Sequence, residues 1–143
     1  MTETTTPSKR IQEPIALADS YRLDATRQLD PDNRAQLGQF LTPAAVAQFM
    51  ASLFNDPLPM AMHLLDAGAG IGSLTAAVID EISKRQQRPA AIQTTFYEID
   101  PVLVNYLHTT VRHCHEACQT LGIDFVAEVV VKDFINDASS ILA

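Results

Sequence analysis

Three glycines at alternate positions are the feature of this sequence most suggestive of chemistry. Gly68, Gly70 and Gly72 lie in the stretch LLDAGAGIGSLTAAV, residues 64–78, and the whole chain has only five glycines. An acid, Asp66, stands two residues before the first of them. Because glycine carries no side chain, it lets the backbone approach a ligand closely. The spacing therefore predicts a ligand-binding turn with a carboxylate at its entrance.

The residues around this turn discriminate between classes of ligand. A dinucleotide-binding turn follows G-x-G-x-x-G/A, and counting from Gly68 its third position is Ser73, so the match is incomplete. Asp66 would also repel a pyrophosphate. A P-loop is excluded because no Gly-Lys-Ser/Thr follows the glycines. The carboxylate favours a nucleoside-like ligand with a cationic end and no phosphate. S-adenosylmethionine is such a molecule, and we expect Asp66 to lie near its ammonium group.

Two further acids follow segments that are predicted to be strands. Glu98 comes after Ala91–Tyr97, and Asp133 comes shortly after Phe125–Val131. In open α/β sheets, ligands bind beyond the carboxyl ends of the strands. We therefore expect Glu98 to bind both ribose hydroxyls and Asp133 to accept from the adenine amino group, with Phe134 against the ring. A tight turn with solvated acids would explain one such residue, but explains three less well.

Alternating strands and helices must position these residues. The apolar patterns predict that the order is strand, helix, strand, helix, strand from residue 63 onward. This order is typical of the first half of a doubly wound parallel sheet with right-handed crossovers. The expected strands are His63–Asp66, Ala91–Tyr97 and Phe125–Val131, and the expected helices are about Ser73–Lys84 and Pro101–Leu121.

The part before the first strand is expected to be helical. Residues 1–36 are predicted to form a tail, disordered over residues 1–10, and a helical arm, and residues 37–143 to form the cofactor-binding part. Thr42 is expected to cap a helix that has Pro43 at its first position. One face of that helix is expected to face the core through Val46, Phe49, Met50 and Phe54.

The composition excludes several classes of protein. Ten basic residues face 17 acidic ones, giving a net charge of −7, which argues against a stand-alone nucleic-acid-binding segment. No apolar run approaches the length of a membrane span, and the polar N-terminus does not resemble a secretory signal. Cys114 and Cys118 give no disulfide framework, so a cytoplasmic location is expected. With His115 they share a predicted helix, where ordinary helix residues are favoured over a zinc site, and no metal is expected.

A resemblance to a known family rests on two segments. GQFLTPAAVAQFM, residues 38–50, lies just upstream of DAGAGIG, residues 66–72. Together they resemble the gamma-type amino-methyltransferases, the adenine-N6 DNA methyltransferases of restriction–modification systems, including type I modification subunits. In that family a G-x-F/Y-x-T-P segment closes over the methionine end of S-adenosylmethionine, and Phe40, Thr42 and Pro43 match it.

The resemblance continues after the second and third predicted strands. YEIDP, residues 97–101, is similar to the family's acidic segment and matches its acid at Glu98. Asp133 and Phe134 match its acid–aromatic pair. The resemblance runs from about residue 38 to residue 135 and implies a Rossmann-like, S-adenosylmethionine-dependent methyltransferase fold.

One part of the family pattern is absent from these 143 residues. The catalytic N/D/S-P-P-Y/F/W tetrapeptide does not occur, so no catalytic residue is assigned. The resemblance therefore predicts the cofactor-binding part of a larger, site-specific adenine methyltransferase, inactive alone. It would contact DNA through the rest of the enzyme, with specificity or restriction subunits as partners. Two alternatives stay open: an rRNA or protein-glutamine methyltransferase fragment, and a non-catalytic Rossmann-like module that binds a nucleotide or a partner.

Overall fold

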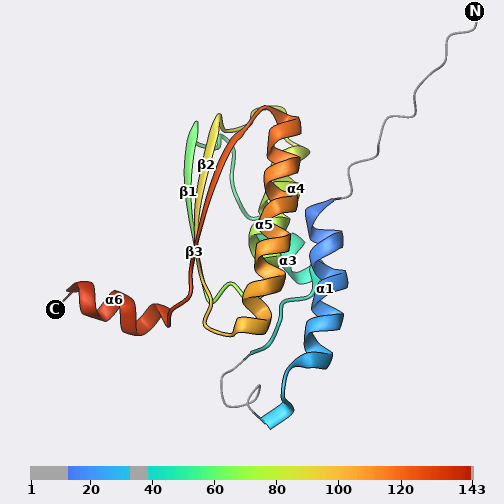
Figure 1. The fold of residues 1–143 in the computed structure, drawn as a ribbon. Coiled ribbons are helices and arrows are strands. Elements are labelled where there is room, and N and C mark those ends of the chain that lie inside the picture. Colours follow the sequence, from blue (N-terminus) through green and yellow to red (C-terminus); the bar gives the residue numbers. More distant parts are fainter. Residues whose placement is uncertain (1–12, 33–38, 143) are drawn as a thin grey trace, which may run out of the picture.

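The computed structural model describes residues 13–32 and 39–142 of the chain (Figure 1). The expected disorder of residues 1–10 lies outside these ranges, as does Gly38, the first residue of the G-x-F-x-T-P segment. No helix in the described ranges is both long enough and apolar enough to cross a membrane.

Three parallel strands form the centre of the fold. They are β1 (Ala61–Ala67), β2 (Ala91–Tyr97) and β3 (Asp124–Val130), in the sheet order β1-β2-β3. Ala67 pairs with Tyr97, and Tyr97 pairs with Val130, so the three strands end level with one another. The expected α/β architecture with a parallel sheet is confirmed. Because the strands are parallel and end level, the segments that follow all three strands leave the sheet at the same end.

Helices cover one side of this sheet (Figure 1). On β2, Ile92, Thr94 and Phe96 are buried, and they alternate with residues that are more exposed. Helices α4 (Ser73–Ser83) and α5 (Pro101–Leu121) contact the strands, α1 (Pro14–Gln28) packs against both of these helices, and α3 (Ala44–Ala51) packs against α4. A last helix, α6 (Phe134–Leu142), follows β3 and points away from the other helices (Figure 1).

Local sequence signals explain the bounds of α5. Asp100 accepts hydrogen bonds from the backbone N–H groups of Val102 and Leu103, which satisfies two donors of the first turn. Pro101, whose ring fixes a helical φ, occupies the first position. Gly122 ends the helix with a φ of 70°, a left-handed conformation that glycine adopts without strain. These bounds agree with the sequence-based prediction.

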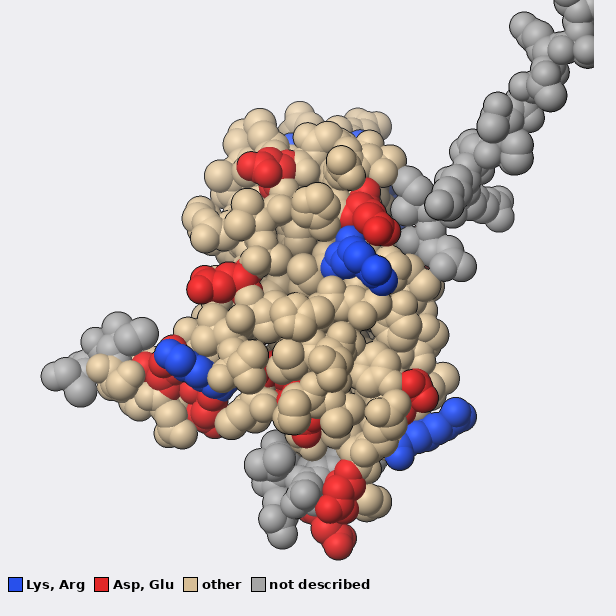
Figure 2. Space-filling view, viewed as in Figure 1, with Lys and Arg blue, Asp and Glu red and all other residues tan. Residues whose placement is uncertain are grey.

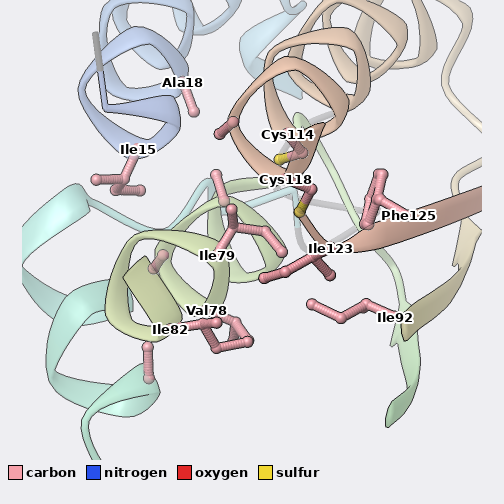
Figure 3. Close-up of a cluster of buried hydrophobic side chains, with 14 of the residues drawn as sticks. Ile15, Ala18, Val78, Ile79, Ile82, Ile92, Cys114, Cys118, Ile123 and Phe125 are labelled. Carbon is pink, nitrogen blue, oxygen red and sulfur yellow. The ribbon is translucent and has the colours of Figure 1, made fainter. Parts of the chain in front are cut away.

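The core lies where α4 and α5 meet the sheet (Figure 3). Ile79 and Ile82 of α4, Ile92 of β2, and Cys114 and Cys118 of α5 are buried there. Burial raises the pKa of both thiols, that of Cys118 to about 12. Both cysteines are free, and the described residues contain no cluster of His, Cys, Asp or Glu that could hold a metal ion. The cysteines thus pack as small apolar residues.

Helix α3 differs from the prediction at its start. It begins at Ala44, with Pro43 as the cap residue, and no cap side chain forms a hydrogen bond. The prediction that Thr42 caps the helix is therefore wrong. Instead, the N–H of Ala44 donates to Oδ1 of Asp19 on α1, at 3.2 Å. A carboxylate from another helix replaces the local cap.

The buried face of α3 also differs from the prediction. Ala47 and Ala51 are the residues that are buried, packed where α3 meets α4. Small side chains let the two helices approach closely, which leaves the bulky residues at the flanks. The four residues expected to face the core are instead exposed: Val46 by 48%, Phe49 by 65%, Met50 by 46% and Phe54 by 41%.

Candidate cofactor-binding site

The glycine turn connects β1 to α4 in a conformation that other residues rarely adopt. Gly68, Gly70 and Gly72 all have positive φ, at 101°, 57° and 84°. The N–H groups of Gly68 and Ala69 both donate to the carbonyl of Tyr97, at 2.9 and 2.8 Å. These bonds tie the turn to the end of β2, so the turn lies beside the residues that follow that strand.

The three glycines differ in what an added Cβ atom would contact. A Cβ atom at Gly70 would lie 3.0 Å from Cδ2 of Leu41, whereas one at Gly68 would have no neighbour within 4 Å. A Cβ atom at Gly72 would lie 2.9 Å from Cδ1 of Leu107 on α5. Gly72 therefore permits helix packing and Gly70 permits the close approach of Leu41, while Gly68 leaves open space in front of the turn.

Glu98 lies at the end of β2, and its carboxylate is held firmly. Its Oε2 accepts from the N–H of Gly70 at 2.8 Å, and its Oε1 accepts from Ile99 and Asp100 at 2.8 and 2.9 Å. The residue is 8% exposed. A carboxylate has about four acceptor positions, so about one is left for a ligand. A ligand that presents two hydroxyl groups must therefore share a position or displace one backbone bond.

A pocket of about 280 Å³ opens beside Glu98. This volume is close to the lower end of the range usual for small-molecule sites, which starts at about 300 Å³. The pocket brings together six of the ten residues proposed from the sequence, drawn from four separate segments: Phe40, Gly68, Gly70, Glu98, Asp133 and Phe134.

The outer wall of this pocket is the start of α6. The ring of Phe134 meets that of Tyr97 edge-on, with centroids 5.2 Å apart and planes at 73°. Oδ1 of Asp133 accepts from the N–H of Asn136 at 2.8 Å, so this carboxylate already caps α6. Tyr97 also donates through its hydroxyl to Asp137, 3.0 Å away. An aromatic face and a carboxylate therefore stand side by side at the carboxyl end of the sheet.

Asp66 lies outside this pocket. Its Oδ2 accepts from the hydroxyl of Thr75 at 3.0 Å, and it lines a separate hollow of about 210 Å³ together with residues of α3 and α4. Burial raises the pKa of Asp66, the bonds from Thr75 oppose that shift, and the charge of Glu98 adds to it. Asp66 therefore lies near the glycine turn but does not line the pocket that Glu98 and Asp133 line.

A third, small hollow of about 40 Å³ lies beside the turn. Thr42, Gly70 and Ser73 are among its lining residues. Ser73 is 5% exposed, and its hydroxyl has no hydrogen-bond partner among the residues that the structure describes. It is also the first residue of α4, where backbone N–H groups lack partners within the helix. Hydrogen-bond donors thus gather where the carboxylate of a ligand could bind.

Ser73 was not predicted as a site residue. Its signal in the sequence was the departure from the dinucleotide pattern, since it stands where that pattern has a glycine or alanine. Pro43 and Gly72, which were predicted, line none of these hollows.

The face of the molecule shown in Figure 2 has no extended basic area among the described residues. On the face shown in Figure 2, Lys and Arg side chains stand singly among Asp and Glu. Lys132, at the pocket, is paired with Asp137 at 2.9 Å, and this contact raises the pKa of Lys132. On this face the described residues therefore offer no broad phosphate-binding surface.

Several known proteins that are similar to this chain are named as methyltransferases. No family model matches the chain. It is 36% identical over 128 residues to the type II methyltransferase M.PstI of Providencia stuartii, covering 87% of this chain and 25% of that protein. It is 35% identical over 107 residues to the type II methyltransferase M.BsuBI of Bacillus subtilis, covering 75% of this chain and 20% of that protein.

Two further likenesses are more limited. The ribosomal RNA small subunit methyltransferase A of Mycolicibacterium vanbaalenii is 40% identical over 62 residues, which is 43% of this chain and 17% of that protein. The crystal structure of SCL7 in Oryza sativa matches with a TM-score of 0.52 at 20% identity, over 91% of this chain and 34% of that chain. This second likeness concerns the fold, which is Rossmann-like. Over most of its length the chain is therefore similar to a part of the type II methyltransferases M.PstI and M.BsuBI, of whose length it spans a quarter or less.

Proposed function

We propose that this chain is the S-adenosylmethionine-binding part of an adenine-N6 DNA methyltransferase of a restriction–modification system. The observation that carries the proposal is the pocket at the carboxyl end of the sheet. There Glu98 and the Asp133–Phe134 pair, from the ends of two strands, meet the glycine turn and Phe40. The relatives are named as type II methyltransferases, which supports methyl transfer.

The residues present fit S-adenosylmethionine. The unpartnered hydroxyl of Ser73 and the N-terminus of α4 suit the carboxylate of its methionine part. Glu98 has an acceptor position for the ribose, and Phe134 offers an aromatic face with Asp133 beside it for the adenine. Asp66 would serve the ammonium group if the methionine part reaches its side of the turn. Once bound, the cofactor supplies an activated methyl group.

DNA is the proposed substrate class, with adenine as the target base. The G-x-F-x-T-P resemblance at Phe40, Thr42 and Pro43 supports adenine, and the fuller match to type II enzymes favours DNA over rRNA. An extruded adenine needs an acceptor for its amino hydrogens and an aromatic platform. The missing tetrapeptide would supply both, so these groups and the DNA contacts belong to another part of the enzyme.

The proposal extends to organisation and partners. In this proposal residues 37–143 are the cofactor-binding part and residues 1–36 a tail and helical arm, and α1, which falls within the arm, packs against α4 and α5. Specificity or restriction subunits would be partners, and the cytoplasm would be the compartment.

Calorimetry tests the proposal directly. The chain is titrated with S-adenosylmethionine and, in parallel, with NAD. We expect the first to bind and the second to fail. Glu98→Gln should weaken binding by about 1.5–3 kcal/mol, roughly 10- to 150-fold, because the ribose contact loses its charge. Glu128→Gln, the same change at an exposed position on β3 that does not line the pocket, is the matched control.

Three results would count against the proposal. Binding of NAD in place of S-adenosylmethionine would favour the nucleotide-binding alternative. No binding of either would favour a module that serves a protein partner. Equal losses in Glu98→Gln and Glu128→Gln would remove Glu98 from the site.

A further inference from the structure

We propose that Gln39 is a positioning residue, whose hydrogen bond to Asp100 latches residues 39–43 against the cofactor pocket and links them to Glu98. This inference rests on the proposed function. It adds a residue that contacts the start of α5 instead of the reacting atoms.

The two carboxylate oxygens of Asp100 accept hydrogen bonds from different donors. Oδ1 accepts from the N–H groups of Val102 and Leu103, at 2.8 and 3.3 Å, and so caps α5. Oδ2 accepts from Nε2 of Gln39 at 2.9 Å. Capping uses only the first oxygen. The bond to Gln39 is therefore not required for α5 to start where it does, and a second role is open to it.

The same residue is joined to the pocket acid. The N–H of Asp100 donates to Oε1 of Glu98 at 2.9 Å. A chain of bonds thus runs from the side chain of Gln39, through Asp100, to the carboxylate of Glu98. Any shift of residue 39 away from α5 would break the first bond in this chain.

The other end of the segment is tied as well. The N–H of Ala44 donates to Oδ1 of Asp19 on α1, at 3.2 Å, and Arg22 holds the same oxygen at 2.7 Å. Between the two ties, Leu41 lines both the pocket and the small hollow beside Ser73. The segment is therefore a short span fixed at both ends, and Gln39 is its fixing point on the pocket side.

Because the two oxygens of Asp100 have different partners, the bond to Gln39 can be broken by one substitution and re-formed by a second. Gln39→Glu sets a carboxylate against Oδ2 of Asp100, which replaces attraction by repulsion. Asp100→Asn keeps one oxygen for the cap and presents an amide donor in place of Oδ2. In the double variant the new amide donates to the new carboxylate, so the bond re-forms with its direction reversed. Gln48→Glu adds the same charge at an exposed position of α3 and is the control.

The first readout is the affinity of S-adenosylhomocysteine, measured by calorimetry on the 143-residue chain. We expect Gln39→Glu to weaken binding about tenfold or more, and Asp100→Asn to weaken it about threefold through loss of charge. The double variant should bind more tightly than Gln39→Glu alone, and Gln48→Glu should bind like the unaltered chain. A purely structural loss would not be rescued by the second substitution.

The second readout needs no ligand. Hydrogen exchange of the backbone amides of residues 40–42 and 44 should be faster in Gln39→Glu and return toward the unaltered rate in the double variant. Unchanged exchange in Gln39→Glu, or additive losses of affinity in the double variant, would overturn the latch. If the unaltered chain binds no S-adenosylhomocysteine, the proposed function fails, and the exchange rates alone decide whether the latch exists.

Discussion

A buried carboxylate on α4 offers the sharpest test of how this fold is held together. Asp80 is 3% exposed, and its Oδ2 accepts from the N–H of Ile15 at the start of α1, at 2.9 Å. The two residues are 65 positions apart. Asp80 thus caps a helix that belongs to the N-terminal arm, and its replacement by asparagine should alter stability in a way that depends on pH.

The expected magnitude follows from the pKa of Asp80. Burial raises it from 3.8 to about 6, against the opposing bond from Ile15, while Glu13 raises it further and Lys84 lowers it. Between about pH 4 and pH 6 the folded chain keeps a proton that the unfolded chain has lost. Stability therefore falls as pH rises through this window, by about 1.4 kcal/mol per unit and about 3 kcal/mol in all. Above about pH 6 this contribution is constant.

Asp80→Asn removes this pH dependence while keeping an oxygen that can accept from Ile15. The new amide N–H groups enter a buried site, at a cost of about 1–3 kcal/mol if they find no partner. The absolute change at one pH is therefore less informative than its slope. We expect the stability of the variant, minus that of the unaltered chain, to rise by about 3 kcal/mol between pH 4 and pH 7.

Urea unfolding followed by circular dichroism, at half-unit steps from pH 4 to pH 8, measures this difference. Asp124→Asn, at an exposed position at the start of β3, controls for loss of one charge. A difference that does not change between pH 4 and pH 7 would refute the reasoning, because it would mean that Asp80 ionises as easily in the folded chain as in the unfolded one.

Three further predictions concern the site. Gly70→Val should abolish binding of S-adenosylhomocysteine in calorimetry while circular dichroism shows little loss of helix, because φ is +57° and the new Cβ would lie 3.0 Å from Leu41; wild-type affinity would make the turn only a packing device. Ser73→Ala should raise the free energy of unfolding by about 1 kcal/mol yet weaken the binding of S-adenosylhomocysteine, since it removes an unpartnered buried hydroxyl. A variant that is less stable and also binds less tightly, or one that keeps both its stability and its affinity, would contradict the role assigned to Ser73. The 143-residue chain should transfer no labelled methyl group to mixed-sequence DNA, and transfer above a heat-killed control would reveal a catalytic group among these residues.

Much of the fold could be predicted because its signals are local. The bounds of β2 and α5 agree with the prediction, since β2 lies between the loop of residues 85–90 and Glu98, and α5 carries Asp100, Pro101 and Gly122 at its ends. β1 extends from Ala61 to Ala67, beyond the predicted four residues, because it pairs along the full length of β2.

The errors arose where contacts distant in sequence decide the outcome. The face of α3 was misassigned because helical spacing indicates a stripe of large residues, whereas close packing against α4 selects Ala47 and Ala51. No local pattern shows that Asp80 would cap α1 or that Asp19 would bind the start of α3. The latch between Gln39 and Asp100 is similarly distant, at 61 positions.

The acids of this chain show why residue types alone overstate a binding site. Glu98 and Asp133 stand where the sequence predicted, yet both already accept backbone N–H groups, three in the case of Glu98. These bonds fix each carboxylate without using all of its acceptor positions. A ligand that binds here would meet carboxylates whose orientation is already set, which would lower the entropy cost of binding but limit how many hydroxyls each can take. The number of acceptor positions left on Glu98 and Asp133 therefore describes the site better than the number of acidic residues in it.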